Sequence, residues 1–559
     1  MSRNSLLWAT LACWSCLGVR GAFAACHFRN AASDNAVTYR FALDETPSGR
    51  RFLITMTFRV KANTPTTIEI PSELISDLHV TSPGAKLKNT SDGDMVVSAS
   101  KSGLVTVSYT LRNGLSGPLV HPREFQPVIL DQYAEITGDK ALIWRKDDDQ
   151  AQVTANFDWQ ALPPEWAVAT SFGVAYPATT DDSKQISSSS RDRCQTYRGP
   201  WSGVNQALFA AGDFRLHRFP IGSQSGVLAV RGTWTFSDEE AANEIGRTVQ
   251  LVRDFWHDDA FPFFLVTLQP FDQDHGSSDG TAYTDAFWMY VSRKDNINRL
   301  LGQLAHESFH AWNPLKMGYL STTEYAKTKW FKEGFTEYYA QKLTLAGGER
   351  STEQVVSSIN RDLLAFPAST NEYVRGRIIA LWLDAAIRER SNGQHSLDDV
   401  MLQLVRDRQE ALTEERIYAT IQPFLSTEQL GALKKAADSG GDLPAPDKIP
   451  GLSACYRARH GEFPTFDLGF DFTSSRAAKT VSGVDPSGPA YKAGLRDGQQ
   501  IVGWDVDRGN TERQAAVTVR IEGQEQRISF RPLGEPKAAW QYQPETDACA
   551  AKPTSTTAY

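Results

Sequence analysis

The feature that most constrains this chain is the segment His306-Glu-Ser-Phe-His310, an H-E-x-x-H pattern. On a helix, residues four apart lie on one face, so the two imidazoles can point toward a single tetrahedral zinc ion. Glu307 lies about 100° further round, where its carboxylate can take a proton from a metal-bound water. Any fold of this chain must therefore hold a helix here with one polar face on a cleft.

The flanking residues predict the ends and the buried side of that helix. Asp295 or Asn296 can cap its start. Asn313-Pro314 should end it, because the residue before a proline avoids helical dihedral angles. A stripe at helical spacing lies opposite the two histidines and should be buried. Its members are Ile297, Leu300, Leu301, Leu304, Ser308 and Trp312.

A third ligand is offered by Glu333, at the start of a second helical segment that ends at Gly347-Gly348. A catalytic zinc takes three protein ligands and keeps one open position. Glu337 lies one turn further on and can accept the free ring N–H of a zinc-bound histidine. The combined pattern predicts a zinc site formed by His306, His310 and Glu333.

The N-terminus predicts export. Arg3 precedes an apolar run from Leu6 to Val19, and Ala22-Phe23-Ala24 is a cleavage pattern, so residues 1–24 are expected to be a signal peptide. The expected location is the bacterial periplasm or the medium. A retained anchor is disfavoured by the short run, and a lipoprotein on Cys26 by a Phe where such signals usually carry Leu. No later stretch reaches transmembrane length.

Four cysteines remain after that segment, an even number that suits an oxidising compartment. They allow three pairings. We expect Cys26–Cys194 and Cys455–Cys549, because each pair would bracket one domain.

The 559 residues are too many for one core and predict a multidomain α+β chain. Residues 25–195 read as an N-terminal β-rich domain, since apolar stretches alternate with turn residues. Residues 200–440 begin with strands and continue as helices, and residues 441–450 resemble a linker. Residues 455–535 form a third domain, and residues 536–559 a polar, mobile tail. With a net charge of −8 and no basic motif, nucleic acid is not an expected partner.

Within the second domain, residues 238–256 and 378–390 predict helices. Residues 272–285 are rich in Gly, Ser and Asp and lie between two strand-like stretches. They are either an ordinary surface turn or part of the lip of the cleft, where a strand can hold a substrate backbone by edge pairing.

Two segments resemble the PDZ-bearing glycyl-aminopeptidase family of bacterial zinc metallopeptidases, within the thermolysin-like gluzincins. They are His306-Glu-Ser-Phe-His310-Ala-Trp312-Asn313 and Trp330-Phe-Lys-Glu333-Gly-Phe-Thr-Glu-Tyr-Tyr339. The third domain resembles a PDZ domain through Leu468-Gly469-Phe470 and Pro489-Ala-x-x-Ala-Gly-Leu-x-x-Gly498. The resemblance covers about residues 200 to 535. It implies a thermolysin-like, mostly helical peptidase domain followed by a PDZ-like domain that could take C-terminal peptides.

The resemblance also implies roles. Zn²⁺ would be held by His306, His310 and Glu333, with Glu307 as general base. A tyrosine would donate to the oxyanion, and Tyr373 is the candidate. The implied function is an exported zinc metallopeptidase acting on peptides or proteins, as an aminopeptidase on small N-terminal residues.

One stretch departs from the family, which usually carries Gly-Leu-Glu-His before the zinc helix, with a Glu that holds the substrate amine. Here the region reads His275-Gly-Ser-Ser-Asp-Gly-Thr-Ala-Tyr-Thr-Asp285. Asp279 or Asp285 could replace that Glu. Two alternatives stay open: a zinc endopeptidase with the same core, and a PDZ-type peptide-binding protein with an idle or structural zinc site.

Overall fold

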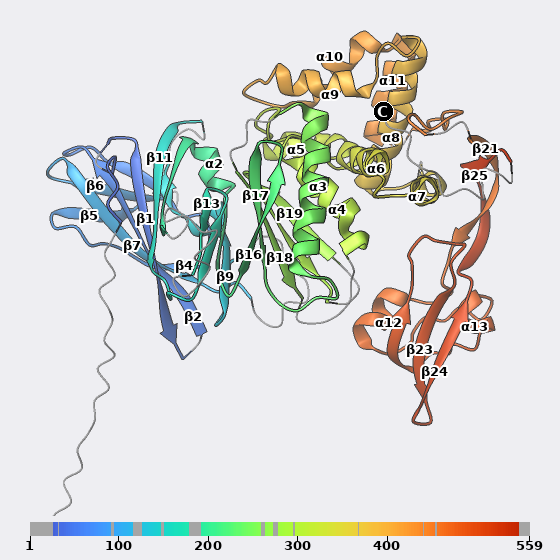
Figure 1. The fold of residues 1–559 in the computed structure, drawn as a ribbon, viewed down its shortest axis with the longest axis horizontal. Coiled ribbons are helices and arrows are strands. Elements are labelled where there is room, and N and C mark those ends of the chain that lie inside the picture. The colour runs from blue at the N-terminus through green and yellow to red at the C-terminus, as the bar shows by residue number, and fades with distance from the viewer. Residues whose placement is uncertain are drawn as a thin grey trace, which may run out of the picture. The chain divides into compact units, whose positions relative to one another are not determined.

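The computed structural model describes residues 26–31, 33–47, 49–90, 94–115, 126–146, 150–177, 192–258, 263–271, 278–293, 297–366, 368–439, 441–452 and 455–546 (Figure 1). Apart from two short segments, one compact unit ends at Asp213 and a second begins at Phe214. The expected signal peptide lies outside the described residues. Within them, every helix is too short or too polar to cross a membrane.

The N-terminal unit consists of β-sheets, as the alternating pattern predicts. Its sheets have the strand orders β14-β11-β1-β2-β7-β4, β10-β3-β6-β5 and β13-β12-β15-β9-β8. In β2, Phe52, Ile54, Met56 and Phe58 are buried, because alternate side chains of a strand face one side. The elements are β1 (Ala36–Thr46), β2 (Gly49–Val60), β3 (Thr66–Glu69), β4 (Ile75–Val80), β5 (Ala85–Asn89), β6 (Met95–Ala99), β7 (Gly103–Arg112), β8 (Val128–Ile129), β9 (Tyr133–Thr137), α1 (Gly138–Ala141), β10 (Trp144–Arg145), β11 (Gln152–Ala161), β12 (Ala167–Thr170), β13 (Gly173–Ala175), β14 (Cys194–Pro200), α2 (Trp201–Asn205) and β15 (Leu208–Gly212).

Cys26 and Cys194 form the predicted disulfide of this unit. Cys455, in the second unit, is also disulfide-bonded. Cys549, the partner expected for it, lies outside the described residues.

The second unit opens with a five-stranded sheet of order β16-β17-β18-β20-β19, followed by a mostly helical region (Figure 1). The central strands β17, β18 and β20 are parallel, and β16 and β19 are antiparallel edge strands. The elements are β16 (Arg215–Ile221), β17 (Gln224–Val230), α3 (Asp238–Trp256), β18 (Phe263–Pro270), β19 (Ser278–Tyr283), β20 (Ala286–Val291), α4 (Ile297–His310), α5 (Thr322–Lys329), the π-helical turn η2 (Trp330–Phe335), α6 (Thr336–Ala346), α7 (Thr352–Ala365), α8 (Glu372–Arg390), α9 (Leu397–Arg406), α10 (Glu414–Ile421), the 3-10 turn η3 (Gln422–Phe424) and α11 (Thr427–Ser439).

Three of these elements differ from the expectations. Residues 278–283 form the edge strand β19, where a loop was expected, because they pair along their length with the buried strand β20. Helix α4 ends at His310, three residues before Asn313. Helix α8 begins at Glu372, ahead of the expected residue 378, because the Asn371 side chain caps it by accepting a hydrogen bond from Tyr373 N.

The C-terminal part of this unit consists of a two-stranded ribbon, a three-stranded sheet and two short helices. These are β21 (Tyr456–Phe466), α12 (Phe472–Ala478), α13 (Pro489–Lys492), β22 (Gln500–Asp505), β23 (Ala515–Ile521), β24 (Gln524–Phe530) and β25 (Leu533–Pro544). The sheet and helices enclose a small core of their own. Tyr456 and Tyr542 of the ribbon instead belong to the core of the helical region. Since β25 runs to Pro544, the polar tail expected from residue 536 does not begin there.

Candidate metal centre and active site

Helix α4 and the turn η2 bring three predicted ligands together. His310 Nε2 lies 3.1 Å from His306 Nε2, and Glu333 Oε2 lies 3.3 Å from His310 Nε2 and 3.5 Å from His306 Nε2. Ligand atoms about 2.0–2.1 Å from a tetrahedral zinc ion are separated by about 3.3 Å. Among the described residues this is the one cluster of such groups. The three side chains therefore fit one face of a zinc tetrahedron.

The local sequence explains why α4 presents its histidines to this site. Every member of the predicted stripe, from Ile297 to Trp312, is buried. Phe309 is also buried and joins the same core. With one side of the helix fixed in the core, His306 and His310 must face the opposite side, where η2 carries Glu333.

The second ring nitrogen of each histidine has its own partner. His306 Nδ1 lies 3.2 Å from Glu337 Oε2, as the helical spacing predicted. His310 Nδ1 lies 2.8 Å from the carbonyl oxygen of Asn313, a contact that the pattern did not reveal. Such partners fix the tautomer and the orientation of a metal-binding ring. Both Nε2 atoms are thereby directed toward the site.

The charges of the cluster suit a bound cation. Burial raises the pKa of Glu333, but hydrogen bonds with His306 and His310 outweigh burial and hold this pKa well below its usual range. Burial lowers the pKa of His310 to about 4. For His306, burial is outweighed by hydrogen bonds with Glu333 and Glu337, which raise the pKa to about 10. The ionised carboxylate thus attracts positive charge to the position that a metal ion would take.

Glu337 is held in turn by Arg377, a residue that sequence reasoning missed. Arg377 Nη1 donates to Glu337 Oε1 at 3.2 Å and to Ser358 Oγ at 2.9 Å, and the guanidinium pairs with Asp362. Burial raises the pKa of Glu337, but His306 and Arg377 outweigh it and lower the pKa to about 2. Glu337 therefore supports His306 as an ionised carboxylate.

Tyr373 lies beside the metal-ligand cluster, in the first turn of α8. Its ring stacks on that of His306, with ring centroids 5.8 Å apart and the planes inclined by 24°. The residue is 42% exposed. Burial and the charge of Glu333 raise its pKa well above the ordinary value, so the phenol keeps its proton. Tyr338 and Tyr339, by contrast, are buried in the core.

Two glycines let α8 approach the ligand-bearing turn. A Cβ atom at Gly376 would lie 1.9 Å from the carbonyl oxygen of Trp330, and one at Gly334 would lie 2.1 Å from Gly376 Cα. Tyr373 and Arg377 are four residues apart and share the face of α8 that carries Gly376. The spacing of Tyr373, Gly376 and Arg377 was therefore a signal in the sequence that could have identified Arg377.

Glu307 is buried, and the edge strand β19 passes beside it. A Cβ atom at Gly280 would lie 3.4 Å from Glu307 Cγ and 3.0 Å from the carbonyl oxygen of Trp288. A larger residue at position 280 would therefore be crowded. The backbone of β19 runs along the predicted general base.

Lys332 contacts the ligand carboxylate and was also missed. Its Nζ lies 2.8 Å from Glu333 Oε1 and 4.9 Å from the ring centre of Tyr325 on α5. Burial lowers the pKa of Lys332, but the charge of Glu333 outweighs burial and raises it. A positive charge thus lies on the far side of the carboxylate from the histidines.

Asp285 and Asp279 are the two aspartates predicted as possible amine-binding groups. Burial raises the pKa of Asp285 to about 6, although the positive charge of Lys316 opposes this rise. Lys316 itself pairs with Asp258 at 2.7 Å. Asp258 accepts a hydrogen bond from Trp312, on the buried stripe opposite the histidines. Asp279 lies on β19, and its side chain is outside what the structure describes.

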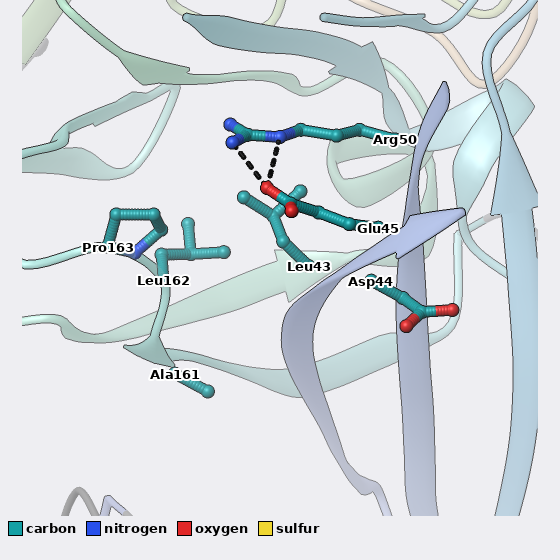
Figure 2. Close-up of a pocket in the computed structure, with 7 residues that line it drawn as sticks. All are labelled: Leu43, Asp44, Glu45, Arg50, Ala161, Leu162 and Pro163. Atoms are coloured by element: carbon teal, nitrogen blue, oxygen red, sulfur yellow. Dashed lines mark hydrogen bonds and ion pairs between the residues drawn. The ribbon is translucent and has the colours of Figure 1, made fainter. Parts of the chain in front are cut away.

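A hollow of about 370 Å³ in the N-terminal unit offers no comparable chemistry. Arg50 Nη2 pairs with Glu45 Oε1 at 2.6 Å, and Asp44 pairs with Arg51 at 2.8 Å, so each charged group of the hollow has a partner of opposite charge. Figure 2 shows the Arg50–Glu45 pair beside apolar side chains. The lining residues are Leu43, Asp44, Glu45, Arg50, Ala161, Leu162 and Pro163.

Comparisons with known proteins agree with this geometry. Residues 299–377 match the family described as M61 glycyl aminopeptidase, while none of the curated proteins matches the chain. An aminopeptidase N family protein from Idiomarina loihiensis superposes with a TM-score of 0.62 at 15% identity, over 92% of this chain and 99% of that one, which establishes a shared fold. An M1 zinc metallopeptidase from Deinococcus radiodurans gives a TM-score of 0.48 at 15% identity, over 75% of this chain and 96% of that one. Residues 299–377, which include the buried His-His-Glu cluster, match the M61 glycyl aminopeptidase family, and the chain is a zinc metallopeptidase.

Proposed function

We propose that His306, His310 and Glu333 hold the zinc ion, that Glu307 is the general base, and that Tyr373 stabilises the oxyanion. The observation that carries the proposal is the spacing of the three ligand atoms, 3.1, 3.3 and 3.5 Å, which matches a tetrahedral zinc site. When bound, zinc supplies Lewis-acid polarisation of the substrate carbonyl and of water.

The side chains of the chain itself then move the protons. Glu307 accepts a proton from water as the water oxygen bonds to the carbonyl carbon, and delivers it to the amine nitrogen as the C–N bond breaks. The Tyr373 hydroxyl donates a hydrogen bond to the developing oxyanion, a contribution of about 2.7–4 kcal/mol for donors of this kind. The edge strand β19 can pair with an extended substrate, and Gly280 lets that backbone run close to Glu307.

The experiment that tests this assignment compares Glu307→Gln with the wild type. The variant should keep its zinc, because the three ligands are untouched, and should lose about 10²–10⁴-fold in kcat, as expected when a general base is removed. Zinc content by metal analysis and hydrolysis of a glycyl peptide give the two readouts. Wild-type turnover in the variant would remove Glu307 from this role.

We further propose aminopeptidase action on peptides with small N-terminal residues, which the family match supports. A second candidate is endopeptidase action, favoured because residues 275–285 lack the Glu with which the family usually holds a substrate amine. Assays of one peptide with a free and with an acetylated N-terminus separate the two. An aminopeptidase must reject the acetylated peptide, and an endopeptidase must cleave both.

Residues 455–535 are, in the same proposal, a PDZ-like module for C-terminal peptides. Gly469 has a φ of +70°, and a Cβ atom there would lie 2.7 Å from Pro489 Cδ, so its loop packs closely against the start of α13. The alternative is a packing module, supported by the burial of Tyr456 in the helical core. Fluorescence anisotropy with labelled peptides should give tighter binding of a free than of an amidated C-terminus if the module captures peptides.

Export completes the proposal: residues 1–24 are a signal peptide, and the mature protein is periplasmic or secreted. The Cys26–Cys194 disulfide supports an oxidising compartment. N-terminal sequencing of the protein recovered from bacterial periplasm should begin at Ala25. A chain that keeps Met1 in the cytoplasm would contradict export, and acylated Cys26 would indicate a lipoprotein.

A further inference from the structure

The two oxygens of the Glu333 carboxylate have different partners. Oε2 faces the histidine nitrogens, at 3.5 Å from His306 and 3.3 Å from His310. Oε1 faces away from them and lies 2.8 Å from Lys332 Nζ. Side chains adjacent in a helix do not normally face each other, so Lys332 must turn back toward its neighbour to make this contact.

A second contact keeps Lys332 in this position. Its ammonium lies 4.9 Å from the ring centre of Tyr325, which belongs to the preceding helix α5. The Lys332 side chain is only 22% exposed. A carboxylate on one side and an aromatic ring on the other restrict a side chain that is otherwise among the most flexible.

We propose that Lys332 is a positioning residue that keeps Glu333 a one-oxygen ligand and thereby preserves the open coordination position of the metal. The inference rests on the proposed zinc site. A carboxylate can bind a metal through one or both oxygens, and a second oxygen would take the position that water and substrate need. A charge-assisted hydrogen bond to Oε1 opposes that rotation.

Loss of the Lys332–Glu333 ion pair should have a different effect on zinc affinity and turnover from loss of a residue that only supports the fold. Lys332 withdraws negative charge from the ligand and adds a positive charge near the metal, so it should weaken zinc binding slightly. Without it, the carboxylate can approach with both oxygens. Affinity and turnover should then change in opposite directions, whereas damage to the site would lower both.

The test is Lys332→Met in the full chain, which keeps the apolar stem and removes the charge. Competition with a chelator should show zinc bound at least as tightly as in the wild type. The kcat on a glycyl peptide should fall about tenfold or more, the usual effect of losing a partner of a metal ligand. Absorption bands of the Co²⁺-substituted variant should weaken, since added coordination weakens them. Lys332→Arg should restore kcat, because a guanidinium can donate to the same oxygen.

Lys327→Met is the matched control. Lys327 pairs with Glu324 at 2.9 Å on the exposed side of α5, so its loss should leave both readouts unchanged. Tyr325→Leu, which keeps Lys332 but removes the ring, should shift both readouts in the same sense by a smaller factor. Equal falls in zinc affinity and kcat, or no change in either, would overturn the inference. Failure of the zinc site itself would be distinguished by a wild type that binds no zinc.

Discussion

The contact between Gly376 and the Trp330 carbonyl allows a sharp test of how the site is built. Replacing Gly376 with Ala would place a methyl carbon 1.9 Å from that backbone oxygen, and contacts below 3.0 Å are essentially never seen. Helix α8 would have to move by at least about 1 Å, and a misplacement of this size can cost about 10²-fold in rate. Overpacking of this kind destabilises by about 1–3 kcal/mol, which exceeds the gain of about 1 kcal/mol in helix propensity.

Gly431→Ala in α11 is the control for this substitution. Gly431 is exposed, and a Cβ atom there would meet nothing within 4 Å, so the change should stabilise by about 0.5–1 kcal/mol and leave kcat unchanged. Urea unfolding followed by tryptophan fluorescence and hydrolysis of a glycyl peptide measure both variants. A Gly376→Ala protein as stable and as active as the wild type would refute the claim that this contact sets the position of α8.

Three further outcomes follow from the structure. Glu337→Gln should weaken zinc binding about 10- to 100-fold in chelator competition, because His306 loses a charged partner. Because the pKa of Asp285 is raised in the folded state, the protonated side chain favours folding below its ordinary pKa of 3.8. This contribution to the free energy of unfolding is lost as the pH rises through about 6. At pH 8, Asp285→Asn should therefore have a higher free energy of unfolding in urea than the wild type, by at most about 3 kcal/mol. This difference should vanish toward pH 4. Cys26→Ser should destabilise the N-terminal unit by about 2–5 kcal/mol in thermal unfolding, since the disulfide closes a loop of 168 residues, and a reductant should destabilise this unit only in the wild type.

The zinc helix could be predicted because its signals are local. The spacing of His306 and His310 and the buried stripe behind them repeat with the helical period, and α4 forms there, although it ends three residues before Asn313. The capping box of Ser396 and Asp399, which opens α9, is a signal of the same local kind. Each of these signals lies within one or two helical turns, so no knowledge of the fold was needed to interpret it.

Features that depend on distant segments could not be predicted in this way. Ser278–Tyr283 has the composition of a loop, and it becomes β19 only because β20 offers a partner along its length. The ribbon strand β25 likewise forms by pairing with β21, far from it in the sequence. Lys332 carries no signal of its own, since a lysine beside a glutamate on a helical segment normally faces solvent.

One helix, α8, influences both a face of the His306 ring and its Nδ1 edge. Tyr373 stacks on the ring, and Arg377, one turn later, holds Glu337 against its Nδ1 atom. Gly376 directly precedes Arg377 in α8, and any side chain at this position would meet the Trp330 carbonyl. The distance of α8 from η2 therefore sets the proposed oxyanion donor and the support of a metal ligand together. A shift of α8 cannot disturb one without the other, and the absence of a side chain at Gly376 is what lets α8 lie this close to η2.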